Sequence, residues 1–247
     1  MKLLIDIGNT RLKWALSRDG QLGEVGAVAH DGEPARVLIE LPAAAVAAVW
    51  IAQVTGESQA AALDVATQSR FGLRPQYARS TAQWRDLRNA YAEPARLGVD
   101  RWLTLIAAWS ESRGACAIVN AGTALTGDGI DGEGRHLGGF IAAGLDAHQR
   151  AVLGATRFET RAQAPAYDAG FGRDTERCVQ QGAMLACLGA ADRAARLAGA
   201  GARRLLAGGD AGLLLPHLDG AWTLRPHLVL EGLQVLADDR SSPAADR

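Results

Sequence analysis

Apolar and polar positions at the start of the chain follow the pattern of a β-hairpin. Apolar runs predict strands at 2–7 and 12–17, which residues 8–11 join as a turn. The sequence Ser-Arg-Asp-Gly at 17–20 is typical of a second turn, and the apolar stretch 41–54 is typical of a buried strand and its approach. The opening of the chain is therefore predicted to build a sheet from a hairpin.

The spacing becomes helical over 98–114, where Gly114 ends the pattern. The apolar positions of this segment are Val99, Trp102, Leu103, Ile106 and Ala107. A long helix is predicted from about 175 to 197, and 203–214 is interpreted as a strand, a glycine turn and the start of another helix. Beyond Leu236 the chain turns polar and is expected to fray.

The opening pattern recurs in the second half of the chain. The stretch Ile-Asp-Ile-Gly-Asn-Thr at 5–10 aligns with Val-Asn-Ala-Gly-Thr-Ala at 119–124, again between two apolar runs. Internal similarity of this kind indicates a duplicated unit. We predict two similar halves, 1–113 and 114–238, followed by a tail at 239–247.

Composition narrows the classes of partner. The chain has 247 residues, 48% of them hydrophobic, with a net charge of −1. Because basic residues are not interleaved with aromatic ones, nucleic-acid binding is not indicated. The most apolar window, 41–54, is shorter than the roughly 20 residues that a membrane helix needs. Three cysteines without a CxxC pair fit buried thiols in a reducing cytoplasm. We therefore expect a small-molecule partner, with no nucleic acid and no membrane.

Glycine turns between strands suit phosphate binding, because backbone N–H groups can approach a ligand closely where there is no side chain. A Walker loop is excluded, since the chain has no GxxxxGK[ST] sequence. Gly127, Gly129 and Gly132 match GxGxxG by letter, but no helix pattern follows them. We interpret these three glycines as part of a turn and not as a dinucleotide site.

Four stretches together resemble the type III pantothenate kinases, a group that also includes the Bvg accessory factor proteins. They are DIGNTRLK at 6–13, GVDRW at 98–102, NAGTALTGD at 120–128 and GGFIAAG at 138–144. The resemblance implies an α/β fold of the actin, Hsp70 and hexokinase superfamily, with two duplicated ribonuclease H-like domains facing a nucleotide cleft. It also implies a homodimer that phosphorylates pantothenate to 4′-phosphopantothenate with ATP, the first step of coenzyme A biosynthesis.

The resemblance assigns an ATP site to three segments. In the first, Asp6 would hold Mg²⁺ through water, and Lys13, one of only two lysines, would contact phosphate. The implied ATP-binding residues are Asp6, Ile7, Gly8, Asn9, Thr10, Arg11, Leu12, Lys13, Gly122, Thr123, Gly208 and Gly209. The alternative interpretation is an ordinary hairpin turn at 8–11 and a plain strand-to-helix loop at 208–209.

The resemblance also assigns a pantothenate site, with Asp100 as the catalytic base that takes the proton of the attacking hydroxyl. The implied substrate-binding residues are Tyr91, Gly98, Val99, Asp100, Arg101 and Thr175. A guanidinium group such as that of Arg101 suits the carboxylate of pantothenate. The residues alone leave other roles open. Asp100 also suits the N-terminus of a helix, and Asp174 and Thr175 are equally suited to helix capping. Arg101 also suits a surface ion pair, and Tyr91 suits packing.

One position departs from the family. Where the family has an acid linked to a monovalent cation, K⁺ or NH₄⁺, this chain has Asn120, so the cation requirement is in doubt.

Two other functions stay open on the sequence: another phosphotransferase of the superfamily, and a nucleotide-binding regulatory protein without catalysis. The presence of Asp6, Asp100 and Arg101 favours the kinase.

Overall fold

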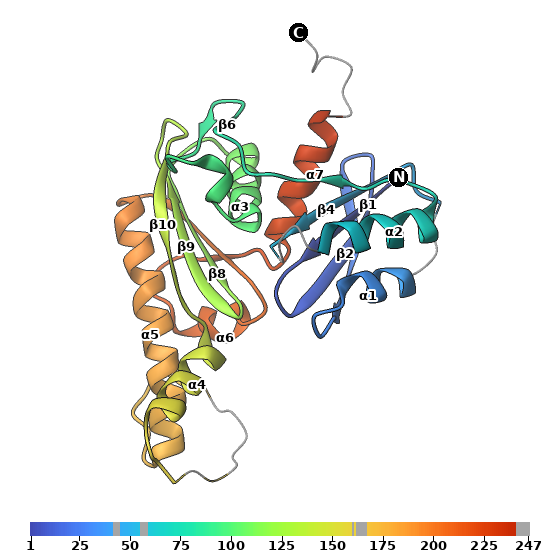
Figure 1. Cartoon of the computed structure of the whole chain (residues 1–247). Helices are drawn as coiled ribbons and strands as arrows, with labels where there is room; N and C mark the ends of the chain where they lie inside the picture. The colour runs from blue at the N-terminus through green and yellow to red at the C-terminus, as the bar shows by residue number, and fades with distance from the viewer. Residues whose placement is uncertain (42–44, 55–58, 160, 162–166, 241–247) are drawn as a thin grey trace. The chain divides into compact units, whose positions relative to one another are not determined.

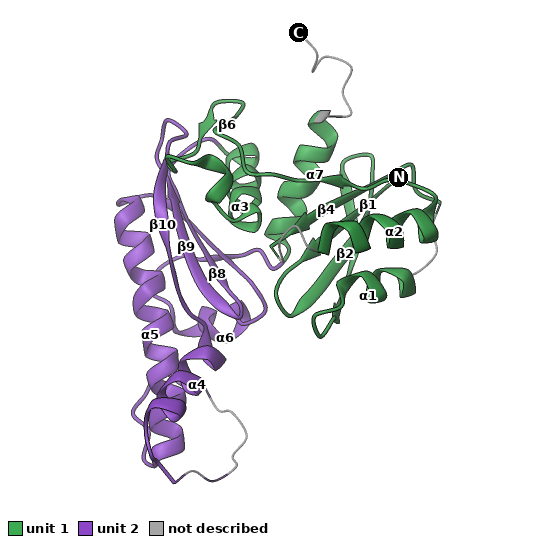
Figure 2. Ribbon diagram, viewed as in Figure 1, with its two compact units in different colours: residues 1–112, 227–247 green, residues 113–226 purple. Residues whose placement is uncertain are grey.

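The computed structural model describes residues 1–41, 45–54, 59–159, 161 and 167–240. The chain divides into two compact units (Figure 2): unit 1 comprises residues 1–112 and 227–247, and unit 2 comprises residues 113–226. Each unit is built on a five-stranded sheet (Figure 1).

The sheet of unit 1 has the strand order β3-β2-β1-β4-β5. Strands β1 to β3 are antiparallel neighbours, whereas β4 and β5 add to β1 in parallel. The predicted turn at 17–20 is confirmed: Asp19 and Gly20 both have positive φ, as a tight two-residue hairpin turn requires. The strands span β1 Lys2–Ile7, β2 Arg11–Arg18, β3 Gln21–Ala29, β4 Ala48–Gln53 and β5 Gln76–Tyr77.

Helices cover both faces of this sheet. Because side chains alternate along a strand, Leu3, Ile5 and Ile7 of β1 face one side, where they pack with Leu38 and Leu63 of α1 and α2. Helices α3 and α7 pack against each other and against β1 and β4 on the other side. The remaining elements of unit 1 are α1 Pro34–Glu40, α2 Ala60–Phe71, the short hairpin β6 Gln83–Trp84 with β7 Leu87–Arg88, the 3₁₀ turn η2 Pro94–Arg96, α3 Val99–Glu111 and α7 Leu228–Arg240.

Unit 2 repeats this design. Its sheet has the order β10-β9-β8-β11-β12, with the same sequence of antiparallel and parallel neighbours as in unit 1. Residues Val119, Ala121 and Leu125 of β8 and β9 pack against Met184 and Ala191 of the long helix α5. The predicted internal duplication is therefore confirmed in strand order and direction. The elements are β8 Cys116–Ala121, β9 Ala124–Ile130, β10 His136–Ala143, α4 Leu145–Ala155, α5 Thr175–Ala198, β11 Arg203–Ala207, α6 Ala211–Leu214, η3 Leu215–His217 and β12 Thr223–Leu224.

The end of the chain differs from the sequence expectation. Helix α7 groups with unit 1, although the predicted boundary assigns it to the C-terminal half. Gly232 explains this packing, because a Cβ atom at that position would collide with the backbone carbonyl of Leu103 in α3. The expected fraying after Leu236 is wrong for residues 237–240, which are helical. Asp239 accepts hydrogen bonds from Trp84 and Arg85, while 241–247 lie outside the described residues.

Candidate active site

The turn between β1 and β2 presents the first predicted phosphate motif. The Gly8 N–H donates to the Arg11 carbonyl over 3.1 Å, which closes the turn. His30, which follows β3, also contacts this turn through Gly8 and Thr10. Asn9, Thr10 and Arg11 are exposed, so the turn can meet a ligand.

Asp6 lies at the end of β1 on the face that α3 and α7 cover, as does Leu4 two residues earlier. Lys13 of β2 is its direct cross-strand partner. Burial raises the pKa of Asp6 to about 7; Lys13 opposes this rise, and the negative charge of Asp100 adds to it. A carboxyl group in this setting favours a bound cation, because a cation restores the ionised form.

Asp100 lies in the first turn of α3. Its Oδ1 accepts the backbone N–H of Arg101 over 2.8 Å, and Gly98 is the N-cap residue of the helix. A Cβ atom on Gly98 would lie 2.6 Å from this Oδ1. Gly98 therefore leaves the space that the Asp100 carboxylate occupies, a role that the sequence interpretation of Gly98 as a substrate contact did not include.

Arg101 is a buried cation, with a relative exposure of 4%. Its Nη1 donates to the Tyr91 hydroxyl over 3.0 Å, and its guanidinium carbon lies 5.8 Å from the Tyr91 ring centroid. Tyr91 is held in turn by Asn89, whose Oδ1 accepts the Tyr91 N–H. The alternative of a surface ion pair at Arg101 does not hold, because its side chain is buried beside Tyr91.

Unit 1 thus brings together two predicted sets of residues, the first phosphate turn and the Gly98–Arg101 segment with Tyr91. Asp6 and Asp100 lie close enough for their charges to interact. Among the described residues, no group of three or more histidine, cysteine or acidic side chains forms a metal cage. A single carboxylate that holds Mg²⁺ through water is compatible with that arrangement, because Mg²⁺ keeps several of its waters in proteins.

The second glycine turn lies between β8 and β9 of unit 2. Gly122 N–H donates to the Ala124 carbonyl over 3.1 Å, which parallels the bond that closes the Gly8 turn. Asn120, at the end of β8, pairs with Thr126 of β9 and Ala207 of β11. The side chain of Asn120 is neutral, so no carboxylate stands at this position of the second motif.

The turn at 208–209 also lies beside the end of β8. Gly208 has φ +99°, and a Cβ atom there would collide with the Ala121 backbone. Asp210 N–H donates to the Ala121 carbonyl over 3.0 Å. Burial raises the pKa of the Asp210 carboxyl, and the charge of Asp146 adds to this effect. Glycine at 208 is therefore required for the close approach of this turn to the Gly122 hairpin.

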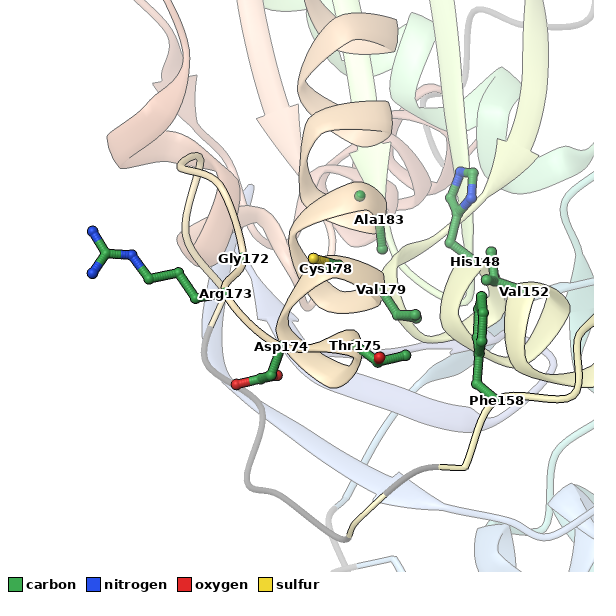
Figure 3. Close-up of a pocket in the computed structure, with 11 residues that line it drawn as sticks. His148, Val152, Phe158, Gly172, Arg173, Asp174, Thr175, Cys178, Val179 and Ala183 are labelled. Atoms are coloured by element: carbon green, nitrogen blue, oxygen red, sulfur yellow. The ribbon is translucent and has the colours of Figure 1, made fainter.

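Thr175 lines a pocket of about 700 Å³ between α4 and the start of α5. Figure 3 shows Thr175 and Val179 directed toward Val152 and Phe158, whereas Asp174 points away. Asp174 caps α5 by accepting the Arg177 N–H over 2.8 Å. Of the two capping candidates, Asp174 fills that role with its side chain, which leaves the Thr175 hydroxyl on the pocket side.

The sequence interpretation assigned no role to two histidines of unit 1. His30 contacts the Gly8 turn, and His227 lies near Lys13, where burial and the lysine charge lower its pKa. Neither belongs to a recognisable motif, so only their positions in the fold reveal them.

Two further corrections concern the cysteines and a glycine match. Cys178 is exposed and not buried. The turn interpretation of the GxGxxG match is wrong for Gly127 and Gly129, which lie within β9 and pair with β10, and holds for Gly132 in the turn that follows β9. The strand β9 leads into β10 and not into a helix.

Two sheets of the same order, each with a glycine turn between its first two strands, define the nucleotide-binding fold of the actin, Hsp70 and hexokinase superfamily. Two solved structures support this class. A putative Baf family transcriptional activator from Campylobacter jejuni aligns with a TM-score of 0.62 at 21% identity, covering 97% of this chain and 98% of that one. An activator of 2-hydroxyisocaproyl-CoA dehydratase from Clostridium difficile with bound ADPNP aligns with a TM-score of 0.53 at 11% identity, covering 97% and 95%.

The sequence comparisons define the family. The model of the type III pantothenate kinases matches residues 2–197. A type III pantothenate kinase of Aromatoleum aromaticum is 38% identical, covering 96% of this chain and 98% of the relative, and that of Halorhodospira halophila is 35% identical, covering 94% and 96%. The chain belongs to the type III pantothenate kinase family, whose members phosphorylate pantothenate in coenzyme A biosynthesis.

Proposed function

We propose that this kinase transfers the γ-phosphoryl group of ATP to the primary alcohol of pantothenate through the residues assembled in unit 1. The observation that carries the proposal is the position of Asp100, near Asp6 and next in sequence to the buried Arg101, which donates to Tyr91. Two carboxylates, a lysine and a guanidinium group supply what phosphoryl transfer requires: charge neutralisation, orientation and a proton acceptor.

For the nucleotide, we assign the phosphates to the turn at residues 8–11 and to Lys13, with Gly122 and Thr123 as the second phosphate segment and Gly208 and Gly209 toward the adenosine. Mg²⁺, when bound, neutralises phosphate charge as it develops. Asp6 would hold that ion through water, and the raised pKa of its half-buried carboxyl, about 7, supports a cation partner.

For pantothenate, we assign its carboxylate to the Arg101 guanidinium, which Tyr91 orients. Gly98 and Val99 place the start of α3, so that the Asp100 carboxylate meets the substrate hydroxyl. The hydroxyl oxygen attacks the γ-phosphorus, its proton moves to Asp100, and the bond from phosphorus to the β,γ-bridging oxygen breaks. The products are 4′-phosphopantothenate and ADP. A loose transition state requires the proton late, so orientation of Asp100 matters as much as its basicity.

The assignment of Asp100 as the base predicts the behaviour of Asp100→Asn. This variant keeps the volume of the side chain and an oxygen that can accept the Arg101 N–H, so the fold and MgATP affinity should persist. Turnover should fall by roughly 10²- to 10⁴-fold, the range for a positioned proton acceptor. ADP release, measured with and without pantothenate, tests both the reaction and the residue. Near-normal turnover, or a drop in melting temperature without a specific loss of turnover, would favour the capping role instead.

We further propose a homodimer, with Thr175 as a pantothenate contact at the pocket in unit 2. Helix α5 supports this assembly, because Gly182, Leu185, Ala186 and Gly189 are exposed at spacings of three and four residues and form one accessible face. Small residues allow two helices to approach closely. A large charged side chain at the centre of that face, in Ala186→Arg, should convert the dimer to a monomer of 25.9 kDa in sedimentation analysis. A native protein that sediments as a monomer refutes the assembly.

The monovalent cation and the location of the enzyme complete the proposal. The neutral side chain of Asn120 supports at most weak K⁺ or NH₄⁺ dependence. Within the described residues, no helix is long and apolar enough to cross a membrane. We place the enzyme in the cytoplasm, where ATP is available and where the three free cysteines stay reduced.

A further inference from the structure

His30 is a buried side chain with both ring nitrogens in use. Its relative exposure is 3%. The Gly32 N–H donates to Nδ1 over 3.2 Å, so Nδ1 carries the lone pair. The hydrogen must then lie on Nε2, which donates to the Gly8 carbonyl over 2.8 Å. The tautomer of His30 is therefore set by two backbone groups, one at each ring nitrogen.

His30 also holds the turn through its own backbone, because its N–H donates to the Thr10 carbonyl over 3.3 Å. Two carbonyls of the turn, those of Gly8 and Thr10, thus face the same residue. In a planar trans peptide, the C=O of one residue and the N–H of the next point in opposite directions. Fixing the Gly8 carbonyl toward His30 therefore directs the Asn9 N–H to the opposite, ligand-accessible side of the turn.

We infer that His30 is a positioning residue for the phosphate-binding turn at residues 8–11. Its Nε2–H holds the Gly8 peptide in the orientation in which the Asn9 N–H faces a phosphate of ATP. This inference rests on the proposed function, which places ATP at the turn. His30 lies about twenty residues from the motif in sequence and does not itself contact the nucleotide.

Two conservative substitutions separate the two hydrogen bonds of the ring. In His30→Gln, the amide nitrogen is as many bonds from Cα as Nε2, so it can donate to the Gly8 carbonyl. In His30→Asn, the amide oxygen is as many bonds from Cα as Nδ1, so it can accept from Gly32 but does not reach Gly8. His30→Ala removes both. Thr67→Val is the matched control, because it removes a buried side-chain hydrogen bond to Leu63 within α2 of the same unit.

The experiment measures MgATP affinity by calorimetry, KM for each substrate, melting temperature, and deuterium uptake by the peptide 6–13 in the ligand-free protein. We expect His30→Ala and His30→Asn to weaken MgATP binding by roughly 5- to 20-fold, since one hydrogen bond no longer orders the turn. Deuterium uptake at 6–13 should increase in both variants. His30→Gln should restore most of the affinity, Thr67→Val should bind MgATP normally, and KM for pantothenate should change little throughout.

Equal MgATP affinity in the Gln and Asn variants overturns the inference, as does normal affinity in His30→Ala. Parallel loss of both substrates with a falling melting temperature also overturns it, because that pattern indicates general destabilisation. Failure of the proposed function gives a different result. If the native protein binds MgATP without pantothenate-dependent ADP release, the substrate assignment fails, and the affinities and exchange data still decide the role of His30. If the native protein binds no MgATP, both proposals are refuted.

Discussion

Asp6, which we propose as the Mg²⁺-holding residue, lowers the stability of the ligand-free protein at neutral pH. Its pKa is about 7 in the folded chain, against an ordinary value of 3.8, and burial is the main cause. The folded state therefore binds a proton more tightly than the unfolded state between these two values. The free energy of unfolding falls as the pH rises from about 4 to 7, and above pH 7 the full cost of the buried charge is present.

Asp6→Asn should consequently stabilise the ligand-free protein at pH 8, by on the order of a few kcal/mol, and this gain should disappear toward pH 4. The same variant should lose the thermal shift that MgATP produces, since a neutral amide holds a hydrated Mg²⁺ poorly. Melting temperatures of both proteins from pH 4 to 8 provide the test. Asp19→Asn, at an exposed turn of the same sheet, is the control. A pH-independent difference between Asp6→Asn and the native protein would contradict the assigned titration.

Several site residues could be predicted from their neighbours in sequence, and others could not. Asp6 with Lys13, and Asp100 with Arg101, stand within short motifs, and the fold keeps each pair together. His30 belongs to no motif, because the role that we infer for it depends on a hydrogen bond from its side chain to the Gly8 carbonyl of the first turn. The burial of Arg101 could not be predicted from the sequence either, since it depends on the packing of α3 and on the Tyr91 hydroxyl.

At the level of elements, the start of α3 sets the direction of the Asp100 carboxylate, which we propose as the base. Gly98 has φ −53° and ψ 131°, values that alanine also adopts, so Gly98→Ala introduces no backbone strain. Its Cβ would nevertheless crowd Oδ1 of Asp100, and the flexible carboxylate would move aside. We expect turnover to fall by roughly 10-fold or more, with little change in melting temperature.

Steady-state kinetics of Gly98→Ala beside Gly132→Ala tests this expectation. Gly132 follows β9, and a Cβ atom there meets nothing within 4 Å, so the control should keep native turnover. Unchanged kcat in Gly98→Ala would mean that Asp100 tolerates displacement or is not the base. A large fall in melting temperature would instead show that the cap of α3 is damaged.

Some helices could be predicted from the sequence, whereas the packing partner of another could not. The helix predicted at 98–114 is observed at Val99–Glu111, and the long helix predicted at 175–197 is observed at Thr175–Ala198, because both have apolar spacing over several turns. The helix against which α7 packs could not be predicted from the sequence. Its packing on α3 joins segments more than a hundred residues apart through one glycine, Gly232, which no local pattern identifies.

At the scale of the whole molecule, duplication gives each unit a strand–turn–strand motif at the same place in its sheet. The first motif ends its strand with Asp6, whereas the second has Asn120 at the position aligned with that acid. The repeat could be predicted from the sequence because the motif and the apolar runs around it recur together. The two copies therefore have the same topology but differ in charge. A substitution at residue 120 can change this charge without changing the fold.

The missing charge predicts how the enzyme responds to monovalent cations. A K⁺ ion held by neutral oxygens alone lacks the Coulomb attraction that distinguishes a bound site from water, so native activity should depend weakly on K⁺. Asn120→Asp restores the acid at the end of β8, opposite Thr126, and should create or strengthen saturable activation by K⁺. Activity is titrated with KCl against choline chloride at constant ionic strength, because salt alone screens charges. Strong saturable activation of the native protein by K⁺ would show that the ion binds well without a carboxylate at 120.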